Sequence, residues 1–319
     1  MPFQLSLSLC PICEKQEKFK FIRDHQNEDG RFSLYECGNC GIQFWNPFKN
    51  PGKEWYEKEY DYAGRNILIS GVYKGSHKKF LDKFKVFPKN TRVLDVGCGI
   101  GEFLAELEKR GCEVWGVDFN KHHTEIATKK FGLKNIYTID LGNFVKKKNL
   151  PQFDIVTFFG VLEHIDNPLG LVREIKRIIK PDGVIVTNAP SKDNLVTGLS
   201  FRDLPPDHLS QWNKEAISKL FQKIDFSISH LEYLGQFLSF KSVATEKFRL
   251  RLGMVDKTAK VLNSGSSKNK NSILLLKAIH FLGEIKDFIV GGIPAAFLLV
   301  LSWLMRKKGG IIFVILKKA

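Results

Sequence analysis

The sequence predicts an α/β protein built on a doubly wound, mainly parallel sheet. Strand-like and helix-like segments alternate through the middle of the 319-residue chain, and a glycine-rich turn follows the first of these strands. An apolar, β-branched run then closes the chain, as a buried strand would. Two pairs of cysteines near the start and a basic, apolar stretch near the end predict an addition at each side of the sheet domain.

The first addition is residues 1–46, where short strand-like runs at 19–23, 32–37 and 42–44 surround two Cys-x-x-Cys pairs. The pairs are Cys10 with Cys13 and Cys37 with Cys40, separated by 23 residues. Four thiolates in two such turns predict a closed, structural Zn²⁺ site, with Zn–S distances of ~2.3 Å. A redox-active dithiol is the alternative, but no βαβ pattern surrounds either pair.

The sheet domain is expected to extend over residues 47–240 and to begin with a helical, aromatic cover at 47–88. Beyond this cover, strands and helices alternate at the spacing typical of parallel sheets. The predicted strands are residues 92–96, 113–118, 135–139, 153–159, 183–188 and 226–233. The predicted helices are residues 102–110, 124–131, 168–179 and 214–224.

The most specific pattern is VLDVGCGIGEF at residues 93–103, where an apolar strand enters a glycine turn before a helix. Its glycines, which permit a sharp turn and close approach of a ligand, are Gly97, Gly99 and Gly101. Asp95 ends the strand at the edge where α/β sheets bind ligands. A dinucleotide fingerprint needs a glycine where Glu102 stands, and that carboxylate would face a pyrophosphate. The loop therefore favours a sulfonium methyl donor over a dinucleotide.

Two more acids end the next two predicted strands. Asp118 ends the second strand, where a carboxylate can accept both hydroxyls of a ribose. Asp140 follows the third strand, where an acceptor can meet an adenine amino group, and Phe119 offers an apolar face for the adenine. One strand-end acid is often only a helix cap, but three at successive strand ends favour a ligand site.

With these motifs the chain resembles the class I S-adenosylmethionine-dependent methyltransferases, in particular those acting on small molecules, quinone precursors and sugars. The resemblance rests on LDVGCGIGEF, GVDFN, FDIVTFFGVLEHIDNP and IKPDGVIVTNAP, and covers about residues 55–240 and the last strand, within 310–319. It implies a Rossmann-like, seven-stranded sheet whose last strand lies antiparallel beside the sixth. The cysteine pairs are similar to zinc ribbons attached to sugar and lipid-linked glycan methyltransferases.

The same resemblance implies roles for individual residues. The three loop glycines would line the methionine end of S-adenosylmethionine, and Asp118 would hold its ribose. Asp140 and Leu141 would lie at the adenine, and Gly160 and Val161 would border the transferred methyl group. Tyr60, Tyr62 and Tyr73 are candidates either to cover the cofactor or to lie in the core.

Methyl transfer is an in-line displacement, so a base is needed only where the acceptor must lose a proton. His208, in a polar and proline-rich loop, is the first candidate for this base, and His164, after the fourth strand, is the second. For His164 a packing or capping role is an equal alternative. His122 and His123, at a predicted helix start, are expected at the surface.

The net charge of +15 is concentrated near the end of the chain, because from residue 241 onward 15 Lys and Arg face 4 Asp and Glu. Residues 241–309 predict a helical, apolar and basic insertion before the last strand. Residues 288–305 are 18 uncharged positions, so a transmembrane helix is one interpretation. A span there would separate the last strand from its sheet, so we expect the insertion to contact an anionic membrane surface or an apolar acceptor. Packing of its helices against the sheet domain is the alternative.

The expected partner is a small-molecule or lipid-linked acceptor, in a cytoplasmic protein that is peripheral at the inner membrane face. The absence of a secretory signal favours that compartment. RNA methylation is a second hypothesis, suggested by the ribbon and the basic charge, and a non-catalytic scaffold is a third. Nucleic acid is disfavoured because GVLEH stands where base N-methylation usually has an Asn/Asp-Pro-Pro-aromatic turn. The complete cofactor motif disfavours the scaffold.

Overall fold

A computed structural model describes residues 8–16, 18–62, 75–194, 204–235, 300 and 308–319. The chain folds into two compact units. The first comprises residues 1–192, 204–234 and 311–319, and it holds every helix and strand named below. The second comprises residues 193–203 and 235–310.

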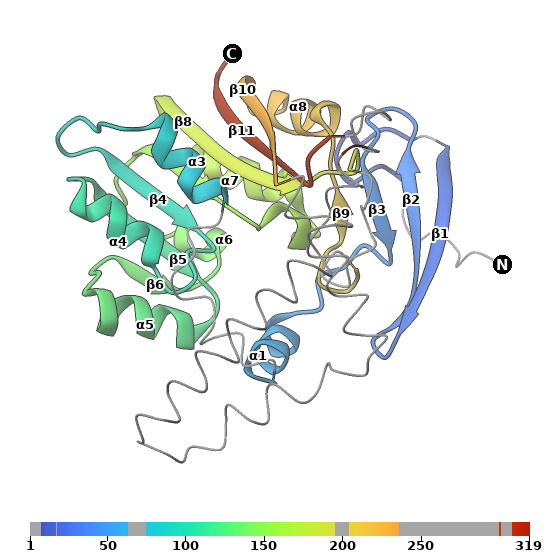
Figure 1. Cartoon of the computed structure of the whole chain (residues 1–319), viewed down its shortest axis with the longest axis horizontal. Coiled ribbons are helices and arrows are strands. Elements are labelled where there is room, and N and C mark those ends of the chain that lie inside the picture. The colour runs from blue at the N-terminus through green and yellow to red at the C-terminus, as the bar shows by residue number, and fades with distance from the viewer. Residues whose placement is uncertain (1–7, 17, 63–74, 195–203, 236–299, 301–307) are drawn as a thin grey trace. The chain divides into compact units, whose positions relative to one another are not determined.

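The main sheet has seven strands in the order β10-β11-β8-β7-β4-β5-β6 (Figure 1). Strands β8, β7, β4, β5 and β6 run parallel to one another, and β11 pairs antiparallel with both β10 and β8. The predicted seven-stranded sheet, with an antiparallel last strand beside the sixth, is therefore confirmed. The strands are β4 (Arg92–Val96), β5 (Glu113–Asp118), β6 (Ile136–Thr138), β7 (Phe153–Phe158), β8 (Ile179–Pro190), β10 (Phe226–Leu234) and β11 (Ile311–Lys318).

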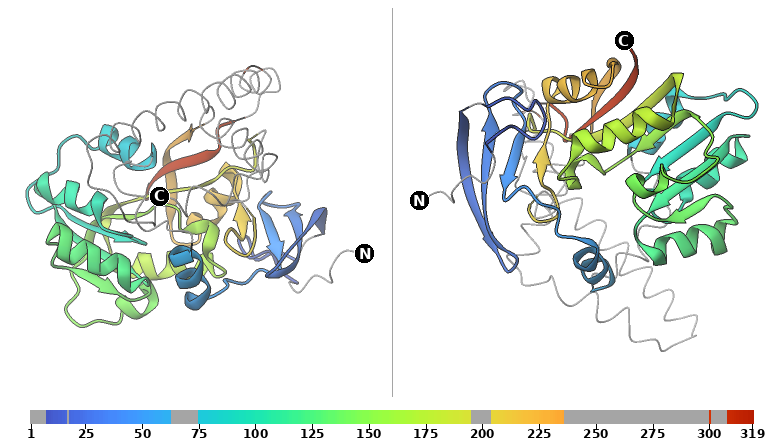
Figure 2. Two further views of the ribbon diagram at one scale, coloured as in Figure 1. Left: turned by 60° about the horizontal axis from the view of Figure 1, so that its bottom comes forward. Right: turned by 180° about the vertical axis from the view of Figure 1, so that it is seen from behind.

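Both faces of this sheet are buried under helices, as expected of a doubly wound fold. Successive residues of one strand enter opposite cores: Val93 packs in the cluster of α3, α4 and α5, and Leu94 in that of α6, α7 and α8. Helix α3 lies in front of the sheet in Figure 1, and α7 and α8 come to the front in the reverse view of Figure 2. The helices are α3 (Gly75–Lys83), α4 (Glu102–Lys109), α5 (Lys121–Phe131), α6 (Leu141–Phe144), α7 (Pro168–Ile178) and α8 (Lys214–Gln222).

The segment predicted as a helical cover, residues 47–88, is helical only in part among the described residues. It holds α1 (Lys53–Tyr62) and α3, and residues 47–52 and 84–88 lie outside them. Pro47 and Pro51 cannot donate to a preceding turn, and Pro88 disfavours helical backbone at the residue before it. Asn90 then adopts a positive φ of 65° on the way into β4.

Several helix boundaries also differ from the prediction. Helix α5 begins at Lys121 rather than 124, because the Asn120 side chain caps it by accepting from the His123 amide at 3.2 Å. Helix α7 ends at Ile178, since Ile179 already pairs with Phe153 as the first residue of β8. The short helix α6 was not predicted.

The cysteine module, residues 8–46, forms an antiparallel sheet with the order β1-β2-β3-β9. Its strands β1 (Phe19–Asn27), β2 (Gly30–Cys37) and β3 (Gln43–Asn46) match the three predicted runs, with the first extended to Asn27. The fourth strand, β9 (Ser210–Gln211), comes from a segment that the sequence predicted as a loop. Backbone pairing with β3 makes it a strand, and no local pattern signals such pairing.

Within the parts of the chain that the structure describes, no helix has both the length and the apolar character that crossing a membrane requires. The predicted insertion at 241–309 lies outside the described residues except for residues 300, 308 and 309. Of the tyrosines proposed as a cofactor cover, Tyr73 and the side chains of Tyr60 and Tyr62 also lie outside them.

Candidate functional site

The glycine turn after β4 is fastened to the end of β5 by a carboxylate. Asp118 accepts the Gly99 amide at 2.9 Å through Oδ2 and the Asn120 amide at 2.8 Å through Oδ1. Gly101 ends the turn with a φ of 80°, and a Cβ there would lie 2.8 Å from side-chain atoms of Ala127 and Leu133. The backbone conformation and the packing of α5 therefore both require glycine at this position.

A cavity of about 300 Å³ opens at the carboxyl ends of β4, β5, β6 and β7. Most of the site residues predicted from the sequence line this one cavity, although they lie far apart along the chain. They are Gly97, Gly99, Asp118, Phe119, Asp140, Leu141, Gly160, Val161 and His164. This edge of the sheet is where open α/β folds bind ligands.

Three predicted residues do not line the cavity. Asp95 is buried in the sheet, where its Oδ1 accepts the Thr157 hydroxyl at 2.7 Å. Gly101 stands behind the glycine turn as the N-cap of α4. His208 is the third, and its ring packs edge-on against His164, with 4.8 Å between ring centroids. Asp95 and Gly101 therefore support the conformation of the glycine turn and do not form part of the cavity wall.

The side of the cavity predicted to meet an adenine contains an exposed acid that also caps a helix. Asp140 caps α6, because its Oδ1 accepts the Asn143 amide at 2.9 Å and its Oδ2 accepts the Asn143 side-chain amide at 2.6 Å. Next to it, Leu141 is buried. Phe119 is 40% exposed, and its ring contacts Tyr56 at 5.4 Å between centroids. Together these residues offer an apolar slot with a carboxylate at its edge.

The opposite side of the cavity is fixed by a chain of hydrogen bonds to β8. The Gly160 amide donates to Asn188 Oδ1 at 2.6 Å, and Asn188 Nδ2 donates to the Ser76 hydroxyl at 2.6 Å. Val161 packs on the glycine turn so closely that a Cβ on Gly97 would lie 2.8 Å from it. The turn after β7 and the glycine turn are thereby held against each other.

His164 is the titratable ring at this end of the cavity. Its Nδ1 lies 2.7 Å from the Asp207 carbonyl oxygen and 3.1 Å from Asp207 Oδ1. A carbonyl oxygen can only accept a hydrogen bond, and so can the oxygens of an ionised carboxyl group. Nδ1 therefore carries the hydrogen, and Nε2 of the neutral ring bears the lone pair. Burial lowers the pKa of His164, but the Asp207 hydrogen bond and the charge of Glu163 outweigh it and raise this pKa above its ordinary value.

A buried carboxylate lies beside this histidine. Glu163 is 6% exposed, and its Oε2 has no hydrogen-bond partner among the described residues. Polar atoms of Glu163, His164 and His208 lie within 4.8 Å of one another. The sequence ranked His208 ahead of His164 as a base, but the structure brings His164 to the cavity wall and leaves His208 behind it.

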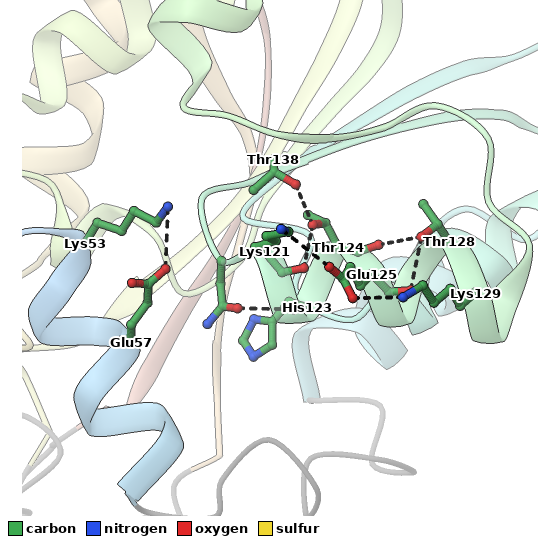
Figure 3. A network of polar contacts seen from close by, with 10 residues as sticks. Lys53, Glu57, Lys121, His123, Thr124, Glu125, Thr128, Lys129 and Thr138 are labelled. Atoms are coloured by element: carbon green, nitrogen blue, oxygen red, sulfur yellow. Dashed lines mark hydrogen bonds and ion pairs between the residues drawn. The ribbon is translucent and has the colours of Figure 1, made fainter.

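Sequence reasoning missed several residues of the cavity wall. Asn50 and Tyr56 reach it from the segment around the start of α1, and Asn50 Nδ2 donates to the His164 carbonyl at 2.7 Å. His123, expected at the surface, lies in the first turn of α5 (Figure 3). It also lines the cavity. No local pattern distinguishes His123 from His122, which is exposed as expected.

The four cysteines of the two pairs converge within the cysteine module. Cys10 Sγ lies 3.6 Å from Cys40 Sγ, and Cys13 Sγ lies 3.7 Å from Cys37 Sγ. A tetrahedral ion with Zn–S bonds of ~2.3 Å requires sulfur–sulfur separations of ~3.8 Å, so this donor set fits Zn²⁺. The Cys40 thiol hydrogen bond lowers the pKa of Cys10 to about 5, and burial raises the pKa of Cys37 to about 11.

Comparisons with known proteins agree with this arrangement. A family model described as a methyltransferase domain matches residues 70–231. The ubiquinone biosynthesis O-methyltransferase of Histophilus somni is 34% identical over 154 residues, which are 46% of this chain and 63% of that protein. The protein of the same description from Actinobacillus pleuropneumoniae is 33% identical over 102 residues, or 30% of this chain and 43% of its own length.

The chain thus spans roughly two fifths to three fifths of the length of these curated relatives. Among solved structures, the cyclase SpnF matches with a TM-score of 0.51 at 15% identity, covering 84% of this chain and 97% of that one. At that identity the likeness shows a shared fold alone. The match over residues 70–231 includes the glycine turn, the strand-end acids and His164.

Proposed function

This chain belongs to the methyltransferase domain family, and from that premise we propose that it transfers a methyl group from S-adenosylmethionine to a small-molecule or lipid-linked acceptor. The observation that carries the proposal is the single cavity that joins the glycine turn, Asp118, Asp140 and His164. When bound, the cofactor supplies a methyl group that its sulfonium already activates.

Within this proposal the chain's own residues bind and orient the cofactor. Asp118 holds the ribose hydroxyls with the lone pairs that its two backbone hydrogen bonds leave free. Asp140 accepts from the adenine amino group, and Phe119 and Leu141 enclose the ring. Gly97 and Gly99 let the methionine end approach the backbone, and Gly160 and Val161 border the methyl group. Asp95 and Gly101 support the turn from behind.

We propose His164 as the base that removes a proton from the acceptor. The hydrogen bond from Nδ1 to Asp207 fixes the tautomer and directs the basic Nε2 away from that partner. A base is required when the attacking atom is a hydroxyl oxygen, which supports an O-methylated acceptor. The curated relatives are described as O-methyltransferases of ubiquinone biosynthesis, which supports a quinone-like acceptor over a sugar.

We further propose that residues 1–46 are a zinc ribbon with one structural Zn²⁺ on Cys10, Cys13, Cys37 and Cys40. In the same proposal, residues 47–240 and 310–319 form the catalytic domain, and residues 241–309 are an insertion. The four sulfur atoms support the first part, because their spacing matches a tetrahedral ion. All four positions on that ion are then filled by protein, so it takes no part in the chemistry.

Two measurements test the proposed function. Calorimetry should detect binding of S-adenosylmethionine, and incubation with methyl-labelled cofactor should label a phenolic quinone precursor or a sugar in mass spectrometry. Failure to bind the cofactor would remove the activity and favour a scaffold. Filter binding to total RNA at two salt concentrations tests the RNA alternative, because a nucleic-acid enzyme binds with steep salt dependence.

We also propose that the basic and apolar residues 241–309 contact an anionic membrane surface at which a lipid-linked acceptor is met. The excess of lysine and arginine in this region supports the proposal. Flotation with anionic vesicles should carry the protein upward, and high salt should release it. Lack of binding would favour a dissolved acceptor, and resistance to salt and to carbonate extraction would indicate a membrane span.

A further inference from the structure

The segment from Leu204 to Gln211 is joined to the active site and to the cysteine module by its main chain. The Leu209 amide donates to the Glu163 carbonyl at 2.7 Å, and the Trp45 amide donates to the Leu209 carbonyl at 2.9 Å. Leu209 and Trp45 are fully buried, so water cannot replace these bonds without opening the interior. One residue thus connects β3 to the turn that carries His164.

A second connection comes from the tip of the β1–β2 hairpin. Asn27 Nδ2 donates to the Pro205 carbonyl at 2.8 Å, and Asn27 Oδ1 accepts the Asp29 amide at 3.1 Å. The turn therefore orients the Asn27 side chain before it reaches the loop. With the pairing of Phe44 and Ser210 across β3 and β9, the cysteine module holds the segment at both ends.

Between these two connections lies the residue that orients the proposed base. Asp207 meets His164 Nδ1 through its carbonyl oxygen at 2.7 Å and through Oδ1 at 3.1 Å. Hydrogen bonds weaken steeply when distance and angle depart from these values. A small displacement of the segment would therefore release the imidazole, and misplacing a reacting group by 1 Å can reduce a rate by ~10²-fold.

The turn that contains Cys37 and Cys40, called the knuckle below, holds the start of β3. Residues 37–42 join β2 to β3, with the Gly41 amide donating to the Cys37 carbonyl at 2.8 Å and the Cys37 amide to the Ile42 carbonyl at 3.0 Å. Lys219 Nζ of α8 also donates to the Asn39 carbonyl within this knuckle, at 2.7 Å. The knuckle thus fixes where β3 begins.

We propose that the cysteine module positions the proposed base, with Asn27 and the main chain of Trp45 as positioning residues that act on His164 through Asp207. The role of His164 itself rests on the proposed function, whereas the contacts do not. Turnover should then depend on the metal at the knuckles although that metal touches neither cofactor nor acceptor.

Hydrogen exchange of the full, zinc-loaded protein tests this positioning without any activity. Removing zinc with a chelator should speed exchange in residues 204–212 by ~10-fold or more, while β4, β5 and β7 stay protected. Slow exchange in 204–212 after complete zinc loss would overturn the proposal. Because this readout needs no turnover, it remains decisive even if the proposed methyl transfer is wrong.

A point substitution tests the hairpin connection. Asn27→Asp keeps the acceptor for the Asp29 amide but removes the donor to Pro205, and we expect kcat to fall ~10-fold with the KM for S-adenosylmethionine and the zinc content unchanged. Arg31→Gln is the matched control, because it changes the charge of the same hairpin equally and removes an ion pair with Asp24 at the surface. Equal kcat in both variants and the parent would contradict the role of Asn27. If Asn27→Asp loses zinc, the exchange experiment on the parent protein decides.

Discussion

Replacing Asp118 by alanine tests the cofactor site most directly. In the free protein this carboxylate accepts the amides of Gly99 and Asn120. In the complex we propose, it would in addition accept two ribose hydroxyls. Hydrogen bonds to a charged group contribute ~1.5–3 kcal/mol each, so losing two of them costs ~3–6 kcal/mol of binding free energy.

That loss corresponds to a ~10²- to ~10⁴-fold weaker Kd for S-adenosylmethionine. The lower end is the better expectation, because the site is partly open and water replaces some of the lost contacts. Isothermal titration calorimetry with S-adenosylmethionine and S-adenosylhomocysteine measures the change, and circular dichroism checks that the variant is folded.

Glu113→Ala is the matched control, because Glu113 stands at the other end of the same strand. It makes an exposed ion pair with Arg92, and such pairs contribute ~0–1 kcal/mol. Its Kd should equal that of the parent protein. A folded Asp118→Ala variant whose Kd stays within threefold of the parent would refute the assignment of Asp118 to the cofactor.

Three further predictions concern the base, the glycine turn and the metal. His164→Ala should lower kcat by ~10²- to ~10⁴-fold with unchanged cofactor binding. In the parent protein, kcat should rise with pH through a midpoint above 6.5, because only the neutral imidazole accepts a proton and the pKa of His164 is raised. Gly101→Ala should lower the free energy of unfolding by about 2–4 kcal/mol in urea titration. The control Gly132→Ala should lower it by less, because φ is also positive at Gly132 but a Cβ there meets nothing within 4 Å. Equal losses of stability in the two variants would contradict the packing argument. Elemental analysis should find one zinc per chain in the parent and in Cys112→Ser, and none in Cys37→Ser. A fully active, metal-free parent would contradict the zinc site.

The glycine turn, the strand-end acids and the cysteine pairs were all predicted from local sequence. Each depends on residues a few positions apart: a glycine spacing, an acid at the end of an apolar run, and two Cys-x-x-Cys turns. The alternation of strands and helices predicted the mainly parallel sheet, and the resemblance to class I methyltransferases implied its antiparallel last strand. Boundaries near Pro47 and Ile179 were wrong, since the backbone there is set by turns and strand partners.

The sequence by itself determined the fold class and the glycine turn, because the periods of apolar residues and the backbone freedom of glycine are local properties. Only the tertiary structure decided which histidine reaches the cavity, because His164 and His208 are 44 residues apart and meet where two loops pack. It also decided that Ser210 joins the sheet of the cysteine module, since that pairing connects residues 166 positions apart. Contacts over such distances depend on the packing of the whole unit and leave no periodic trace in the sequence.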